Sequence, residues 1–387
     1  MKIDTRLTIL DLASWGGFMV FAVSAVIVAI TLPEISETFS TDLSEGGAME
    51  TARNLVILVV LLLAGILAQR WGKKRFLTLG QYLIAAGLLL ASFSPNYPVL
   101  ILALLIMGFG GGFSEALLNP VIVDIHHQNS GRYLNMSHAF YPAGIVASAL
   151  FFGELLTQGY SWRLIFQIAA AVSLFVAIIF TLLRFPAAEK DDSSSLKLFT
   201  SILSLGGFWL FAFAIFLGGS IESALTFWSR SYVETYLSDV PRSGAIALVA
   251  FAGAMAIGRL LSAYLANRMR LNTIMVSSAI LGIGVSFMIP FATSLTWFYV
   301  LLALAGLATA SFWPTVLAEA DSFLNVNTTI LFVLLSSVGI VGFGLTPWIM
   351  GVIGDNSELR TGFAAIPVLF LGLIAILLAE RRLSRKA

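Results

Sequence analysis

Long apolar stretches separated by short polar breaks run through the whole chain. A helix needs about 20 mostly apolar residues to cross the hydrocarbon core of a bilayer. The pattern predicts about twelve such spans, at residues 8–32, 47–69, 75–94, 98–122, 133–156, 162–184, 199–228, 243–266, 272–292, 295–317, 328–352 and 360–380. We therefore expect an all-α membrane protein.

The composition supports this class. Hydrophobic residues make up 58% of the 387 residues and charged residues 11%, whereas soluble domains carry roughly 25% charged residues. The net charge of +1 gives no sign of a nucleic-acid partner. The absence of cysteine excludes disulfides, thiolate chemistry and cysteine-ligated metals. Nothing in the sequence implies a bound cofactor or a metal site.

One polar stretch, PAAEKDDSSSLK at residues 186–197, divides the chain nearly in half and has the composition of a linker. We expect an N-terminal six-helix bundle at 1–185, a cytoplasmic linker at 186–198 and a C-terminal six-helix bundle at 199–387. The first span lacks a small-residue cleavage site, so we expect it to be retained. With a cytoplasmic N-terminus, most Lys and Arg fall in inner loops and tails. Both termini are therefore predicted to be cytoplasmic.

The two halves resemble each other at a nearly constant offset. Leu67 to Arg70 reads LAQR and Leu265 to Arg268 reads LANR, 198 positions later. The tripeptide Gly-Ile-Val recurs at an offset of 195, and Pro120 has a counterpart in Pro314 at an offset of 194. Three concordant offsets indicate a duplication. Parallel repeats of this kind are typical of transporters with a substrate site near the membrane midplane.

Residues 65–74 read GILAQRWGKK. This segment resembles the loop between spans two and three of the major facilitator superfamily, usually G-x-L-A-D-R-x-G-R-[RK], with Gln69 where that family has Asp. The resemblance implies two pseudo-symmetric bundles that alternate access to a central site.

Spans four and five read GFSEALLNPVIVD and LNMSHAFYPAGIVAS. They are similar to the fucose/proton symporter family, which has Glu, three residues and Asn-Pro, and later Leu-Asn before a Phe and Gly-rich run. The resemblance implies that Glu115 is the protonatable carboxylate and Asn119 a sugar contact, with Asn135 in the second motif. The Asn or Asp of that family's first span has no match here.

Glu115 is also the first candidate for proton coupling on physical grounds. It lies inside a predicted span and shares a helical face with Asn119 one turn later. Ionisable groups within a span are costly and mark functional sites by default. Removal from water favours the neutral form of a carboxyl, which suits a group that takes up and releases protons. A carboxylate locked by neighbouring helices is the alternative.

In the fifth span, Asn135 and His138 share a face, with Tyr141 alongside. His138 is a candidate proton relay or sugar contact because histidine titrates near neutral pH; helix packing is the alternative.

In the seventh span, Glu222 forms a polar stripe with Thr226 and Ser229 and is a candidate for proton or substrate binding. Its alternative is a water-facing carboxylate at the outer mouth. Trp228 and Trp313 are candidates to stack on a sugar ring, although tryptophan in membranes is more often an interfacial residue.

In the second span, Arg53 is a candidate substrate contact. Pairing with Glu50 at i, i+3 near the outer mouth is its alternative. Other polar residues near the predicted cytoplasmic ends are candidates for gating. They are Gln69, Arg70, Asp124, Arg259, Asn267 and Arg268.

These features favour a proton-coupled symporter of a small neutral sugar or polyol, with sodium as an alternative coupling ion. We expect a monomer in the lipid bilayer of a bacterial inner membrane. One alternative is a proton-driven exporter of drugs or other amphipathic solutes. Alternatives from another class are a non-transporting sensor and a membrane-embedded enzyme that uses Asp124 with His126 or His127.

Overall fold

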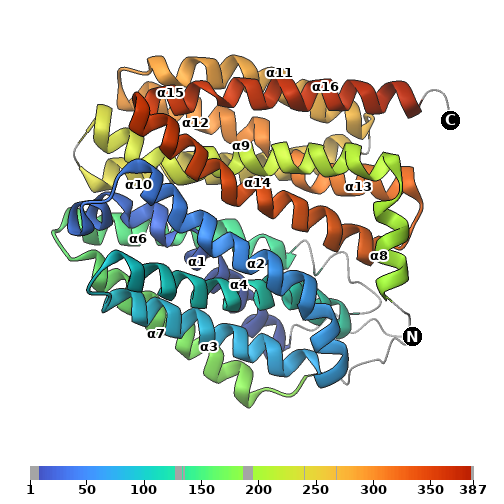
Figure 1. Ribbon diagram of the computed structural model, residues 1–387, viewed down its shortest axis with the longest axis horizontal. Helices are drawn as coiled ribbons and strands as arrows, with labels where there is room; N and C mark the ends of the chain where they lie inside the picture. The colour runs from blue at the N-terminus through green and yellow to red at the C-terminus, as the bar shows by residue number, and fades with distance from the viewer. Residues whose placement is uncertain are drawn as a thin grey trace. The chain divides into compact units, whose positions relative to one another are not determined.

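The computed structural model describes residues 8–126, 133, 136–185, 195–238, 240–266 and 268–384. Every regular element in these ranges is helical (Figure 1). Asn135, His127 and Asn267 lie outside the described residues. In chain order the helices are α1 (Ile9–Phe39), α2 (Leu43–Trp71), α3 (Lys73–Ser92), α4 (Tyr97–Ile125), α6 (Phe140–Thr157), α7 (Trp162–Leu182), α8 (Ser195–Leu203), α9 (Gly206–Tyr236), α10 (Pro241–Ala266), α11 (Leu271–Met288), η1 (Ile289–Phe291), α12 (Leu295–Thr309), α13 (Phe312–Leu324), α14 (Thr328–Asn356), α15 (Leu359–Ala364) and α16 (Ile366–Ser384).

The described residues contain twelve helical segments that are long and apolar enough to cross a membrane. They coincide with the twelve predicted spans, so the predicted fold class is confirmed. The largest differences are at the ends. The first span continues to Phe39 and the seventh to Tyr236, because both helices extend past the apolar stretch into polar residues. The seventh also begins later, at Gly206, after the short helix α8.

Three spans are interrupted shortly before a proline. The fifth has a turn at Ala139 ahead of Pro142, the tenth breaks at residues 310–311 ahead of Pro314, and the twelfth breaks at Ala365 ahead of Pro367. Proline lacks the N–H that would bond to the carbonyl four residues earlier, and its ring clashes with that carbonyl. These three breaks therefore have a local cause in the chain, whereas α4 and α14 continue through Pro120 and Pro347.

The chain divides by its contacts into two compact units. Unit 1 comprises Met1–Phe39 and Leu55–Asp192, and unit 2 comprises Ser40–Asn54 and Ser193–Ala387. The division falls inside α2, whose first residues pack with unit 2.

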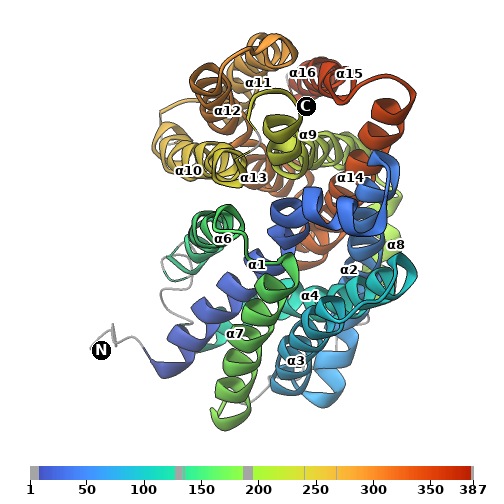
Figure 2. The same cartoon turned by 90° about the vertical axis from the view of Figure 1, so that its left-hand side faces the viewer.

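Within unit 1, α1 packs on α6 and α7, and α3 packs on α4 and α7 (Figure 2). Within unit 2, α9 packs on α14 and α16, and α11 packs on α12 and α16. If the spans are numbered within each half, these are the same pairs: one with five and six, and three with four and six. The shared packing pattern agrees with the duplication inferred from the sequence.

Glycines allow the closest helix contacts. A Cβ on Gly110 of α4 would lie 2.3 Å from the carbonyl oxygen of Gly80 on α3. In unit 2, a Cβ on Gly219 of α9 would lie 2.6 Å from the carbonyl oxygen of Gly339 on α14. Small residues are typical of such contacts because helix association in membranes depends on close packing.

Candidate functional site

Unit 1 holds a partly buried carboxyl without a partner on the described residues. Glu115 of α4 makes no hydrogen bond or ion pair with any of them. Phe109, which is 45% exposed, marks the outer face of α4. Six positions separate the two residues, which places Glu115 about 120° away from that face. The carboxyl therefore points away from the lipid-facing side of the helix.

Asn119 follows one turn after Glu115. Its Oδ1 atom is buried and has no hydrogen-bond partner among the described residues. Buried polar atoms in proteins are nearly always paired, so each exception calls for an explanation such as a ligand or a water molecule. Glu115 and Asn119 thus give α4 two oxygen acceptors, one turn apart, that no described side chain satisfies.

Aromatic side chains of α1 lie between this face of α4 and the start of the fifth span. Gly111, one turn before Glu115, faces the ring of Phe21. The ring of Phe21 lies 5.6 Å from that of Tyr141, and the ring of Phe18 lies 5.4 Å from that of His138. Tyr141 is half-buried and His138 is exposed. In the fold, Tyr141 and His138 therefore contact aromatic rings of α1, which the sequence pattern had not indicated.

Asp124 and His126, which the sequence groups together, have different partners. Both carboxylate oxygens of Asp124 accept hydrogen bonds from Lys73 Nζ, at 2.8 and 2.6 Å. His126 Nε2 lies 2.8 Å from Asp11 Oδ1 in a buried pair, and its ring stacks on Tyr133 with centroids 3.4 Å apart. Asp124 is thus tied to the start of α3, and the two residues do not form a joint acid–base site.

In unit 2, Glu222 of α9 lies beside Arg259 of α10. Arg259 Nη2 is 3.8 Å from Glu222 Oε2. The sequence grouped Arg259 with the candidate gating residues near the cytoplasmic ends of the spans. In the structure, its side chain reaches a carboxylate in the middle of α9. Glu222 therefore has a counter-ion in its own unit, whereas Glu115 has none among the described residues.

The two tryptophans considered as sugar contacts differ in their surroundings. Trp228 is fully buried, and its Nε1–H donates to the carbonyl of Pro347 at 3.1 Å. Because its side chain is fully buried, neither face of the indole is accessible in this structure, and stacking on a sugar stays a prediction. Trp313 is partly exposed, and its ring packs over Gly219 and Gly339.

Near these residues, Thr226 is half-buried, and the buried Ser229 Oγ has no hydrogen-bond partner among the described residues.

Glu50, Arg53 and Asn54 form one buried cluster in the first part of α2. The guanidinium of Arg53 donates to the carboxylate of Glu50 through Nε and Nη2, and Asn54 Nδ2 donates to the same carboxylate at 2.6 Å. Arg53 is only 2% exposed. Its main contact is therefore the structural pairing that the sequence analysis held as the alternative to substrate binding.

The arginine of the duplicated loop motif makes a cation–π contact in each unit, with a different ring position. The guanidinium of Arg70 lies 4.9 Å from the ring centroid of Trp71, and that of Arg268 lies 4.5 Å from that of Tyr264. The side chain of Gln69 is not among those described. Cation–π contacts of this kind hold each arginine at the end of its helix.

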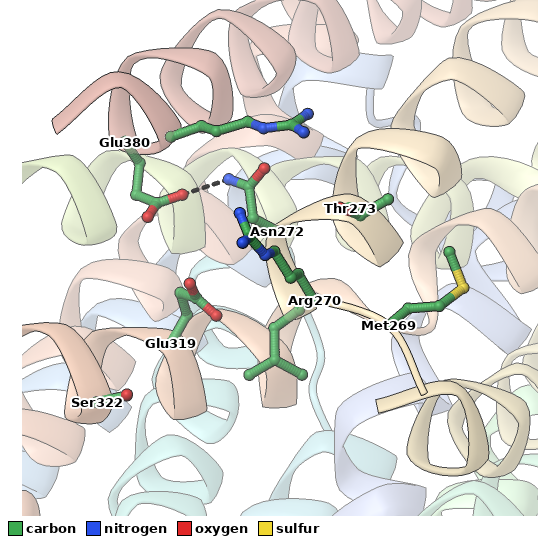
Figure 3. A pocket seen from close by; sticks show the side chains of 9 residues that line it. Met269, Arg270, Asn272, Thr273, Glu319, Ser322 and Glu380 are labelled. Carbon is green, nitrogen blue, oxygen red and sulfur yellow. Dashed lines mark hydrogen bonds between the residues drawn. The ribbon is translucent and has the colours of Figure 1, made fainter. Parts of the chain in front are cut away.

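A polar pocket lies in unit 2 between the start of α11, the last turns of α13 and the end of α16 (Figure 3). Asn272 donates from Nδ2 to the Leu377 carbonyl at 2.8 Å and to the carboxylate of Glu380. Glu319 and Arg270 also line the pocket. Because it lies at helix ends, this pocket is separate from the mid-span groups Glu222 and Arg259.

A family model for the Major Facilitator Superfamily matches residues 14–328. Among known proteins, the membrane protein MosC of Rhizobium meliloti is 24% identical over 352 residues, which are 89% of this chain and 83% of that protein.

Two other relatives match over shorter segments. The L-fucose-proton symporter of Escherichia coli (strain K12) is 24% identical over 209 residues, or 46% of this chain and 48% of that protein. The lincomycin resistance protein of Streptomyces lincolnensis is 30% identical over 181 residues, or 46% of this chain and 36% of that protein. This chain therefore matches less than half the length of either relative.

The crystal structure of the E. coli fucose:proton symporter FucP has a TM-score of 0.66 to this structure at 20% identity. The match covers 95% of this chain and 98% of that one. At this identity the similarity concerns the fold.

Proposed function

Because this chain belongs to the Major Facilitator Superfamily, a family of membrane transporters, we propose that it is a proton-coupled symporter of a small neutral sugar or polyol. The protein is an integral membrane transporter, and its described residues contain twelve candidate spans. This membership contradicts the alternative of a membrane-embedded enzyme. The observation that carries the proposal is Glu115, a membrane-embedded carboxyl without a partner on the described residues.

The position of Glu115 suits a proton carrier. A charged carboxylate within a span is costly unless it is paired, so an unpaired one favours its protonated form. Such a group can bind a proton together with the solute on one side of the membrane and release both on the other. Glu222 is less suited to this role because Arg259 lies beside it as a counter-ion. In this proposal His138, whose ring lies next to Phe18 of α1, is a second proton-relay residue.

The acceptors around Glu115 support a solute with hydroxyl groups. Asn119 Oδ1 can accept a hydrogen bond from a hydroxyl. Tyr141 lies on the aromatic wall formed with Phe21, and an aromatic face of this kind suits the apolar face of a sugar ring. The similarity to an L-fucose-proton symporter over 209 residues supports the same class. Asn135 belongs to this proposed site through that resemblance.

The proposal includes the setting of the protein. We propose a bacterial inner membrane and a monomer, with both termini in the cytoplasm. The concentration of Lys and Arg in alternate loops supports this orientation. Arg70 and Arg268, each stacked on an aromatic ring at the end of its span, are proposed gating residues on the cytoplasmic side. The other proposed gating residues there are Gln69, Asp124 and Asn267.

The test is a solute panel on proteoliposomes that contain the protein and a pH-sensitive dye. We expect L-fucose or another hexose or polyol to cause alkalinisation outside the vesicles, because protons enter with the solute. Amino acids and drugs serve as comparison solutes in the same panel. A response to a drug or an amino acid, with no response to any sugar, would contradict the sugar symporter and leave the fold unaffected.

A proton-driven exporter is the second candidate. The similarity to a lincomycin resistance protein over 181 residues favours it, and an exporter would also use a buried carboxyl. The panel separates the two candidates because an exporter exchanges protons against solute. In that case, drug leaving the vesicles would acidify their interior, whereas symport of a sugar out of the vesicles would make it more alkaline.

A further inference from the structure

Arg259 and Glu222 both face away from the lipid. On α10, the exposed side chains Ile257 and Leu261 mark the outer face. Each is two positions from Arg259, which places the arginine about 160° away from them. On α9, the exposed Phe213 lies nine positions before Glu222 and thus on the opposite side.

The side chains of Arg259 and Glu222 nevertheless keep 29% and 13% of their surface exposed. Since their lipid-facing sides are excluded, this exposed surface lies on the inward side of the two helices.

The hydrogen-bonding capacity of Arg259 is mostly unused. Its separation of 3.8 Å from Glu222 is an ion pair but is too long for a hydrogen bond. Among the described residues, its one hydrogen-bond acceptor is the Met255 sulfur, 3.9 Å from Nη2. The Nε atom is buried and has no acceptor in the part of the chain that the structure describes. A guanidinium has five N–H donors in a fixed plane and stays charged in proteins. Arg259 therefore has unused hydrogen-bond donors, whereas Glu115 and Asn119 have unused acceptors.

We propose that Arg259 is a substrate-binding residue that donates hydrogen bonds to two adjacent oxygen atoms of the transported solute, and that Glu222 positions it. This inference rests on the proposed function. The planar fork of the guanidinium matches two neighbouring oxygens, as in a vicinal diol. Glu222 balances the charge of Arg259, so the solute oxygens need carry no charge. The pair thus selects neutral polyhydroxylated solutes over sugar acids.

Substitutions of the two residues should have different effects on transport. Arg259→Lys keeps the charge but loses the fork, so the KM for a hexose should rise at least tenfold while the maximal rate changes less. Glu222→Gln leaves the positive charge of Arg259 without a counter-ion. D-galacturonate should therefore compete more strongly with D-galactose for transport than it does in the unmodified protein. A purely structural ion pair would produce neither the KM change nor the shift toward the acid.

The experiment measures counterflow of L-fucose and D-galactose, their monodeoxy analogues and D-galacturonate in proteoliposomes. For the unmodified protein, we expect removal of one hydroxyl of a single vicinal pair to raise KM at least tenfold. In Arg259→Lys, removal of the same hydroxyl should raise KM little further, because the contact with the guanidinium is already absent. Arg242→Gln, an exposed arginine on the same helix, is the matched control and should behave like the unmodified protein.

The outcomes separate this inference from the proposed function. If the unmodified protein transports none of these sugars, the proposed function and this inference both fail. If it transports them, but KM and analogue preference are unchanged in Arg259→Lys and Glu222→Gln, only the inference is overturned. If a variant cannot be recovered folded, the deoxy series on the unmodified protein decides, because equal KM values across that series would exclude the diol contact.

Discussion

The carboxylate of Asp355, at the end of α14, accepts a hydrogen bond from the backbone N–H of Leu43, the first residue of α2, at 2.9 Å. It also accepts one from the N–H of Ser44 at 2.8 Å. The first N–H groups of a helix have no intrahelical acceptor, and a negative charge near them is stabilising. A Cβ on Gly351 would lie 2.2 Å from the Leu43 carbonyl oxygen, so the two helices meet here at backbone distance.

Replacement of Asp355 by Ala should loosen the start of α2 from α14. Loss of a capping side chain costs about 0.5–2 kcal/mol. Because the protein has no cysteine, a single Ser44→Cys reports on this contact through its rate of maleimide labelling. We expect Asp355→Ala to increase that rate severalfold and Asp355→Asn, which keeps one acceptor, to increase it less.

The exposed Glu358→Ala is the control for this measurement and should leave the labelling rate unchanged. Equal labelling in the Asp355→Ala background would show that the Asp355 cap does not hold α2.

Asn119→Leu should impair transport without lowering the stability of the protein. Removal of a buried oxygen without a partner should leave stability unchanged or raise it, since such an atom costs about 1–3 kcal/mol. Transport should show a higher KM because the acceptor for the solute is lost. Thermal unfolding and sugar counterflow on the same preparation measure both effects.

Asn272→Leu is the matched contrast, since Asn272 donates two hydrogen bonds within unit 2. It should lower the unfolding temperature. A destabilised Asn119→Leu with normal KM would instead make Asn119 a structural residue.

The buried pair of Asp11 and His126 should stabilise unit 1. Removal of one partner leaves the other buried without its hydrogen bond, which costs about 1–3 kcal/mol. We expect Asp11→Asn and His126→Gln each to lower the unfolding temperature. The double variant should be less destabilised than the sum of the single variants, as a double-mutant cycle would show. Strict additivity would mean that the two side chains do not interact.

The sequence predicts the spans well because apolar length is a property of each segment alone. The breaks ahead of Pro142, Pro314 and Pro367 also have a local cause, since the lost hydrogen bond lies within the helix. The sequence places Glu115 and Asn119 on one face of a helix for the same reason. These features need no knowledge of which helices are neighbours.

The side-chain pairs that join different helices could not be predicted from the sequence. Asp11 and His126 are 115 positions apart, and Glu222 and Arg259 are 37 apart. The helical period gives the face of each residue but not the helix that packs on that face. For the same reason, the residue type of Trp228 could not reveal that Pro347 accepts its N–H. Only the packing of α9 on α14 decides that contact.

The central claim is that Glu115 carries the coupled proton, and Glu115→Gln tests it most directly. A neutral amide cannot release a proton, but exchange of solute across the membrane requires no net proton movement. We therefore expect Glu115→Gln to keep sugar counterflow and to lose both sugar-induced alkalinisation and uptake against a gradient. Glu37→Gln, an exposed carboxyl at the end of α1, is the control and should keep all three. If Glu115→Gln still accumulates sugar in response to a proton gradient, Glu115 is not the carrier.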